Sequence, residues 1–103
     1  MGDELEIQST ANADGSATLT VAGEIDMASA PQFRQALDAA ASSHSAINVD
    51  LSGVTFFDSA GVSALFSYAT KHRIKLTLGN NPTVATVIRV TGLDQVVTVQ
   101  PDP

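Results

Sequence analysis

The sequence predicts one α/β domain built on a mixed, mostly parallel β-sheet. Segments with strand-like alternation of apolar residues alternate along the chain with segments whose apolar residues recur at helical spacing. This order is typical of parallel sheets with crossover helices. The chain has 103 residues, of which 44% are apolar, so it can form one core and we expect a single domain over residues 1–103. It contains no cysteine, which excludes a disulfide scaffold.

The first two strands are expected to form an antiparallel hairpin. Residues 4–8 and 18–22 alternate between polar and apolar side chains, and the turn-forming residues 12–15 lie between them. Residues 23–26 are expected to break the second strand. The first strand is therefore predicted to lie at or near an edge of the sheet.

Three helices are expected to cover this sheet. The first begins at Ser29 or Ala30, since Pro31 suits a first helical turn, and ends at residues 42–44. The second runs over residues 59–71. The third begins at the cap signal of residues 80–82, where Pro82 suits the first helical position, and ends at Gly92.

The remaining strands are expected between these helices and after the last one. Residues 46–51 and 74–78 carry apolar side chains at alternate positions, and residues 96–99 favour a short final strand. Right-handed crossovers would make these strands parallel to the second strand.

The charge distribution argues against a nucleic-acid partner. The net charge is −6, and residues 1–60 hold all but two of the 11 acidic residues with only one base, Arg34. Such a surface repels a phosphate backbone, so we expect no nucleic-acid partner. No apolar run approaches the length of a membrane span, and the acidic N-terminus does not look like a secretory signal. We therefore expect a cytoplasmic protein without membrane insertion.

The inventory of reactive residues gives no case for an enzyme. His44 and His72 share no metal-ligand spacing with carboxylates, and no glycine-rich phosphate loop is present. Glu24, Asp26 and Asp58 could converge at one end of the sheet, but acids at such loop positions usually act as caps and turn formers. We expect no catalytic residue, no metal and no cofactor.

Residues 56–62 join a strand to a helix, and two interpretations apply to them. In the first, Asp58 or Ser59 is simply the N-cap of the helix. In the second, Ser59 is a switchable hydroxyl at the carboxyl edge of the sheet, where a phosphate would add nearly two negative charges beside Asp58.

Small residues on the same predicted helix could form a docking surface. They recur at helical spacing beside the apolar stripe, and small side chains let a partner approach closely: Ala60, Ser63, Ala64 and Ser67. The alternative interpretation is that they are ordinary surface residues of an alanine-rich chain.

Two motifs resemble those of STAS domains, and most closely those of the bacterial anti-sigma factor antagonists. Residues 21–26, VAGEID, are similar to the family's strand followed by G-E-I/L-D. Residues 49–62, VDLSGVTFFDSAGV, are similar to the family signature D-L-S-x-V/L-x-F-I/L/M-D-S-S/A-G-L/V. The resemblance covers about residues 4–99 and agrees with the predicted order of strands and helices.

The resemblance implies a STAS fold and a partner-switching role in transcription, typical of stress responses. In the family, the antagonist binds an anti-sigma factor that is also a serine kinase, and binding releases a sigma factor. The kinase phosphorylates the serine that follows the motif aspartate, and a PP2C-type phosphatase restores the active form. Carried over to this chain, Ser59 is the phosphorylation site, and the partner-binding residues are Gly23, Glu24, Ile25, Asp26, Asp58, Ser59, Ala60, Gly61, Ser63, Ala64 and Ser67.

Two departures from the family pattern affect this assignment. Family members usually continue into a C-terminal helix, whereas Pro101 and Pro103 disfavour one here, so that helix is expected to be short or absent. Its loss could favour a homodimer or lower the stability. Ala60 stands where many members carry a second serine, which leaves Ser59 as the acceptor of that pair. Ser52, Thr55 and Ser63 are secondary candidates.

Other STAS roles stay open at this point. One is a subunit that docks on the ATPase of a lipid-transport ABC system; such a subunit is not expected to need a phosphorylatable serine, so Asp58 and Ser59 favour the antagonist. Another is a sensor of a nucleotide or other anion bound by the bases of residues 71–75, although bases near a helix end also suit a solvated C-terminus.

Overall fold

The computed structural model describes residues 4–100 and confirms the predicted α/β class. In chain order, its elements are β1 (Glu6–Ala11), β2 (Ala17–Ile25), α1 (Ala30–Ser43), β3 (Ala46–Phe57), α2 (Ser59–Ala69), β4 (Arg73–Thr77), α3 (Pro82–Thr91), the 3-10 helix η1 (Leu93–Gln95) and β5 (Thr98–Gln100).

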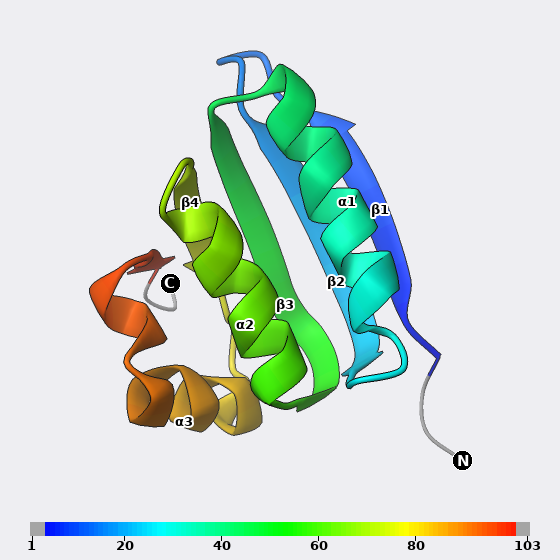
Figure 1. Ribbon diagram of the computed structural model, residues 1–103, viewed down its shortest axis with the longest axis vertical. Coiled ribbons are helices and arrows are strands. Elements are labelled where there is room, and N and C mark those ends of the chain that lie inside the picture. The colour runs from blue at the N-terminus through cyan, green and yellow to red at the C-terminus, as the bar shows by residue number, and fades with distance from the viewer. Residues whose placement is uncertain (1–3, 101–103) are drawn as a thin grey trace.

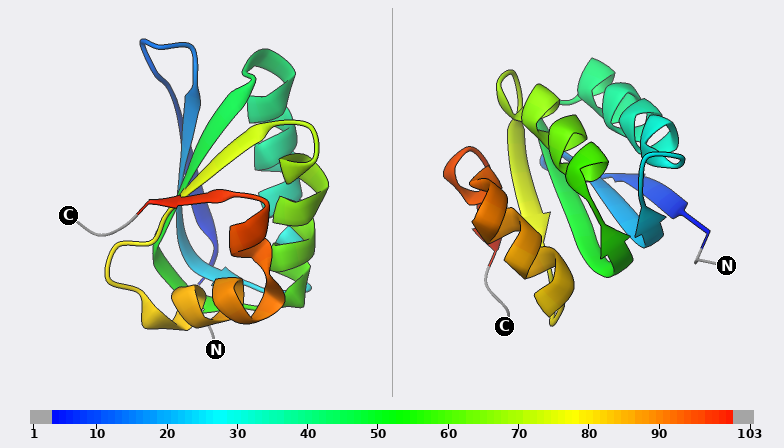
Figure 2. Two further views of the ribbon diagram at one scale, coloured as in Figure 1. Left: turned by 90° about the vertical axis from the view of Figure 1, so that its left-hand side faces the viewer. Right: turned by 60° about the horizontal axis from the view of Figure 1, so that its bottom comes forward.

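The five strands form one sheet in the order β1-β2-β3-β4-β5. β1 pairs antiparallel with β2 at one edge, as the predicted hairpin requires, and the other neighbours pair in parallel. α1 and α2 lie side by side over one face of the sheet, with their N-terminal ends at the same end of the molecule (Figure 1, Figure 2). α3 lies across that end of the sheet.

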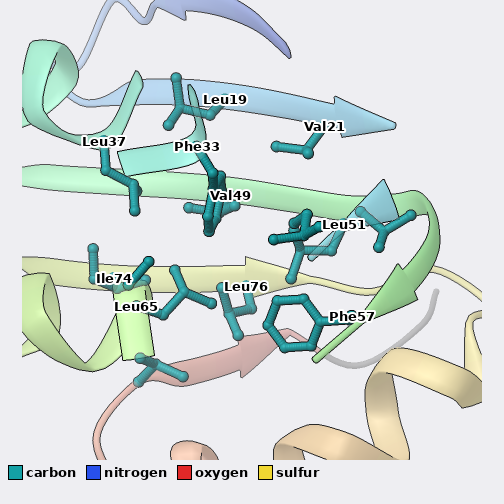
Figure 3. Packing of buried hydrophobic residues seen from close by; sticks show 14 of the residues in the cluster. Leu19, Val21, Phe33, Leu37, Val49, Leu51, Phe57, Leu65, Ile74 and Leu76 are labelled. Atoms are coloured by element: carbon teal, nitrogen blue, oxygen red, sulfur yellow. The ribbon is translucent and has the colours of Figure 1, made fainter. Parts of the chain in front are cut away.

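The core lies between the sheet and the two helices α1 and α2. Alternate strand residues point toward the helices, where they are buried with side chains of the helices themselves (Figure 3): Leu19, Val21, Val49, Leu51 and Leu76 with Phe33, Leu37 and Leu65. The residues between them, such as Thr20 and Asp50, lie on the opposite, polar face. Each large apolar side chain buried in this way contributes about 1.5–3 kcal/mol to the free energy of unfolding.

β2 and β3 run further than the sequence predicts. β2 continues through Gly23 to Ile25, and β3 continues past Leu51 to Phe57, so the expected strand break at residues 23–26 is wrong. The two strands stay paired because β3 accommodates an extra residue at two register shifts, one between Thr20 and Ala22 and one after Gly23.

Local signals placed most helix ends correctly. The Asn81 side chain accepts a hydrogen bond from the Val84 N–H, and Gly92, at a φ of 79°, ends α3 in the left-handed conformation. α1 begins at Ala30, and Ser29 makes no side-chain cap. The final strand starts at Thr98 instead of residue 96, because the preceding residues form η1 and its end.

The expectation about a C-terminal helix concerns residues 101–103, which lie outside the described part of the chain. Within residues 4–100, no helix has both the length and the apolar character that crossing a membrane requires.

Candidate functional site

The two sequence motifs meet at the carboxyl ends of β2 and β3. Ile25 lies opposite Phe57 in the parallel pairing, and the Asp58 N–H donates a hydrogen bond to the Ile25 carbonyl at 3.3 Å. Segments separated by some thirty residues of sequence therefore form one corner of the molecule, next to the first turn of α2.

Asp58 is the N-cap of α2. Its Oδ1 atom accepts a hydrogen bond from the Ala60 N–H at 2.9 Å, and its carbonyl accepts from the N–H groups of Gly61 and Val62. A cap of this kind contributes about 1 kcal/mol to stability. Of the two residues that the sequence left open for this role, Asp58 fills it. Ser59 is the first residue of the helix, and its side chain is exposed.

Gly61 allows close packing between α2 and the ends of β2 and β3, because it has no side chain. A Cβ atom at this buried position would lie 2.6 Å from a ring carbon of Phe57 and 2.8 Å from the Ile25 Cγ2 atom. Because no Cβ is there, the first turn of α2 packs directly against the ends of both strands. Gly61 and Ile25 are thus structural supports of the corner and present no side-chain surface to a partner.

Gly23 is also required by the backbone. Its φ is +97°, and a Cβ atom there would collide with the backbone carbonyl of Glu4. This residue sits at the second register shift between β2 and β3. The glycine of the first motif therefore shapes the strand, and it is buried.

The turn between β2 and α1 is fixed by Asp26 and Ser29. The Asp26 Oδ1 atom accepts a hydrogen bond from the Ser29 N–H at 2.9 Å, and the Ser29 hydroxyl donates to the Glu24 carbonyl at 2.8 Å. The hydrogen bonds from the backbone and the hydroxyl of Ser29 lower the pKa of Asp26 below its ordinary value. Asp26 is therefore a charged turn former, as the acids at this end were expected to be.

The acids of the corner form no metal site. Across residues 4–100, the structure contains no group of three or more histidine, cysteine, aspartate or glutamate side chains placed to hold an ion. Glu24, Asp26 and Asp58 are each half-buried. Of the three, Asp58 is the one that directly precedes Ser59.

The stripe of small residues on α2 differs from the prediction. Ser63 and Ser67 are exposed and Ala60 is half-buried, but Ala64 is completely buried, so its assignment to a docking surface is wrong. The reason is that α2 packs against both the sheet and α1, which makes its buried stripe wider than the predicted one. On the exposed side, the guanidinium of Arg34 reaches from α1 and donates to the hydroxyls of Ser63 and Ser67.

Sequence reasoning missed Met27 as a surface feature. Met27 follows the first motif directly, and 82% of its surface is exposed, although it is a large apolar residue. An apolar residue between a turn aspartate and a helix start belongs to no strand or helix pattern, and that misfit was the available signal. A single exposed apolar side chain is common on protein surfaces, and it is the place of Met27 directly after the first motif that makes it a candidate contact.

Comparison with known proteins identifies the family. The family model described as "Mlab, STAS domain" matches residues 9–99. The chain belongs to the STAS domain family. The resemblance seen in the two motifs is thereby confirmed. The comparison with curated proteins gave no match.

Solved structures of anti-sigma factor antagonists are similar to this one. The crystal structure of an anti-sigma factor antagonist from Mycobacterium paratuberculosis is 31% identical over 96% of this STAS domain and 87% of that chain, with a TM-score of 0.85. The anti-sigma factor antagonist SpoIIAA in its unphosphorylated form is 21% identical over 93% of this chain and 89% of that chain, with a TM-score of 0.74.

A third structure shares the fold. It is the Bacillus cell fate determinant SpoIIAA in the phosphorylated form, 20% identical over 93% of this chain and 92% of that chain, with a TM-score of 0.67. At the identities of the two SpoIIAA structures, the likeness concerns the fold alone.

Proposed function

We propose that this STAS domain is an anti-sigma factor antagonist whose binding is switched off by phosphorylation of Ser59. In this role, it binds an anti-sigma factor that is a serine kinase and so frees a sigma factor for transcription. The activity is binding, without catalysis by this chain, and it takes place in the cytoplasm. The observation that carries the proposal is an exposed Ser59 hydroxyl that the helix cap leaves free, in a chain 31% identical to an antagonist.

The proposed contact surface is smaller than the set of motif residues. The exposed side chains of Ser59, Ser63 and Met27 lie at or near the carboxyl end of β2 and β3, and half-buried Asp58 and Asp26 lie beside them. Met27 would supply the apolar anchor and Ser59 a close, uncharged contact. The buried motif residues support this surface from below: Gly23, Ile25, Gly61 and Ala64.

The switch would act by charge at the surface. The Ser59 oxygen attacks the γ-phosphorus of ATP bound to the kinase, the bond to ADP breaks, and the hydroxyl proton leaves to a base of the kinase. The phosphate adds nearly two negative charges next to Asp58. Packing that charge against the partner requires its desolvation beside a like charge. A loss of a few kcal/mol corresponds to a hundredfold to about thousandfold weaker binding.

The fold should survive the modification. The cap hydrogen bond belongs to Asp58, so a phosphate on Ser59 leaves it in place. The N-terminus of a helix also tolerates negative charge, because the helix dipole is positive there. We therefore propose a switch that changes the surface and not the folded state. A PP2C-type phosphatase would reverse it by hydrolysing the phosphoserine.

Paired pull-downs from the source organism test this function. The baits are the Ser59→Ala and Ser59→Asp variants, with Ser42→Asp as a control that adds the same charge at an exposed position near the end of α1. We expect the Ser59→Ala and Ser42→Asp baits to capture a kinase-type anti-sigma factor and the Ser59→Asp bait to lose it.

Capture of the same proteins by all three baits would contradict the switch. If the shared protein were a transporter ATPase, the chain would instead be the docking subunit of a lipid-transport system, and Ser59 would have no regulatory role.

A further inference from the structure

The Arg34 side chain extends from α1 to α2 and makes two long hydrogen bonds there. Its Nη2 atom is 3.2 Å from the Ser63 hydroxyl, and its Nη1 atom is 3.4 Å from the Ser67 hydroxyl. Both of its side-chain hydrogen bonds among residues 4–100 thus go to neutral oxygens and are long. A guanidinium binds an anion with shorter and stronger paired bonds than these.

Ser59 belongs to the same row of hydroxyls. Ser59, Ser63 and Ser67 are spaced four residues apart on α2, and all three are exposed. Neighbours in such a row lie about 5–6 Å apart between their Cβ atoms. α1 and α2 run side by side in the same direction (Figure 1). To meet a phosphate on Ser59, the Arg34 side chain would turn from Ser63 by one helical turn toward the N-terminal end of α2.

A phosphate on Ser59 could also pair with a nearby cation. The helix N-terminus tolerates the negative charge, but the Ala60 N–H is already bound by the Asp58 carboxylate and the N–H groups of Gly61 and Val62 by the Asp58 carbonyl. The Asp58 carboxylate itself repels the phosphate. Arg34 is the one base in residues 1–60 of the sequence. Lys71 follows the C-terminal end of α2, whereas Ser59 is at its N-terminal end.

We propose that Arg34 is the intramolecular receptor of the Ser59 phosphate. This inference rests on the proposed phosphorylation of Ser59. When the phosphate is present, the guanidinium leaves Ser63 and Ser67 and pairs with it. The modification then changes the exposed surface of α2 over more than two turns, since two hydroxyls are released as the phosphate is drawn toward α1.

A titration of the phosphorylated chain tests the pairing. Phosphoserine is placed at position 59 during translation, so no kinase is needed, and the protonation of the phosphate is followed by phosphorus NMR. A guanidinium partner favours the doubly charged phosphate, so the midpoint pH in the chain with Arg34 should be lower by about 0.5 than in the Arg34→Gln variant. Arg34→Lys should retain part of the difference.

Lys71→Gln is the matched control. It removes the same charge just beyond the C-terminal end of α2, and the midpoint pH should equal that of the phosphorylated chain without a further substitution. Equal midpoints in the Arg34→Gln and Lys71→Gln variants would overturn the proposal.

A second measurement needs no substitution at Arg34. The nitrogen NMR signal of the Arg34 Nε–H is compared with and without the phosphate in the otherwise unchanged chain. A clear shift supports the pairing, and an unchanged signal overturns it.

These results are separate from those of the pull-downs. A lowered midpoint without capture of an anti-sigma factor would keep the role of Arg34 and reject the proposed partner. Capture that depends on Ser59, with equal midpoints in the variants, would keep the proposed partner and reject the role of Arg34.

Discussion

Replacing Gly61 by alanine should destabilise the protein, although alanine favours helices. The new Cβ atom would lie 2.6 Å from the ring of Phe57 and 2.8 Å from Ile25. Both of these side chains are in the core, with at most 3% of their surface exposed, so neither can move away freely. Overpacking of this kind costs about 1–3 kcal/mol.

The gain in helix propensity offsets part of that cost. Alanine is favoured over glycine by about 1 kcal/mol inside a helix, and by less in the first turn. The free energy of unfolding should therefore fall by about 1–2 kcal/mol, which corresponds to a Tm lower by about 5–10 °C for a domain of this size. Urea unfolding followed by circular dichroism measures the difference.

Ser63 provides the matched control, since it is exposed and one half-turn further along α2. There, alanine should be more stable than glycine, because only the propensity differs between the two variants. A Gly61→Ala variant as stable as the unmodified chain would show that α2 does not pack tightly on the strands through this glycine. In that case, the first turn of α2 must have more room than the distances to Phe57 and Ile25 allow.

Three further predictions concern the same corner. Asp58→Ala removes the acceptor of the Ala60 N–H and should lower the free energy of unfolding by about 1 kcal/mol in urea titrations, whereas a loss below about 0.3 kcal/mol would contradict the cap. The Asp26 carboxylate, with its lowered pKa, contributes stability that is full above its unfolded value of 3.8 and is lost as the pH falls through the lower folded value. Ser29→Ala removes the hydroxyl but keeps the backbone hydrogen bond, so NMR titration should find the Asp26 pKa raised part of the way toward 3.8; an unchanged pKa would show that the hydroxyl has no effect. Met27→Ser should leave the Tm unchanged, because the side chain is exposed, but should weaken capture of the partner at least tenfold, about 1.4 kcal/mol; full capture would place Met27 outside the interface.

Local sequence signals were sufficient for much of the fold. Asn81 and Pro82 mark the start of α3 and Gly92 marks its end, because each of these residues acts through its own backbone or its immediate neighbours. The alternation of Leu19 and Val21 in β2 likewise predicts the buried face of the strand. Such features depend on few residues outside the segment itself.

Other features depend on partners distant in the sequence. β2 continues through Gly23 because β3 accommodates an extra residue opposite it, and no pattern within residues 23–26 reveals this. Ala64 is buried because α1 packs beside α2, so a single helix cannot predict its environment. The choice between Asp58 and Ser59 as the cap is decided by the extended backbone at Asp58, since both residue types are suitable.

The sequence predicted where the candidate site lies, but it did not predict that Arg34 would lie beside the serines of α2. The motifs placed Ser59 and the segment of residues 23–26 at one end of the sheet, where the structure brings them together. The position of Arg34 over Ser63 depends on how two helices pack, and a lone base in an acidic half of the chain was its sole sequence signal.

In the proposed switch, the charge on Ser59 controls partner binding while the protein remains folded. Calorimetric titration of the anti-sigma factor captured by the Ser59→Ala bait measures this dependence. The titrants are the unmodified chain and the chain with phosphoserine at position 59. We expect a Kd about 100-fold to 1,000-fold higher for the phosphorylated chain, with an unchanged circular dichroism spectrum. Equal Kd values for the two chains would contradict the proposed switch.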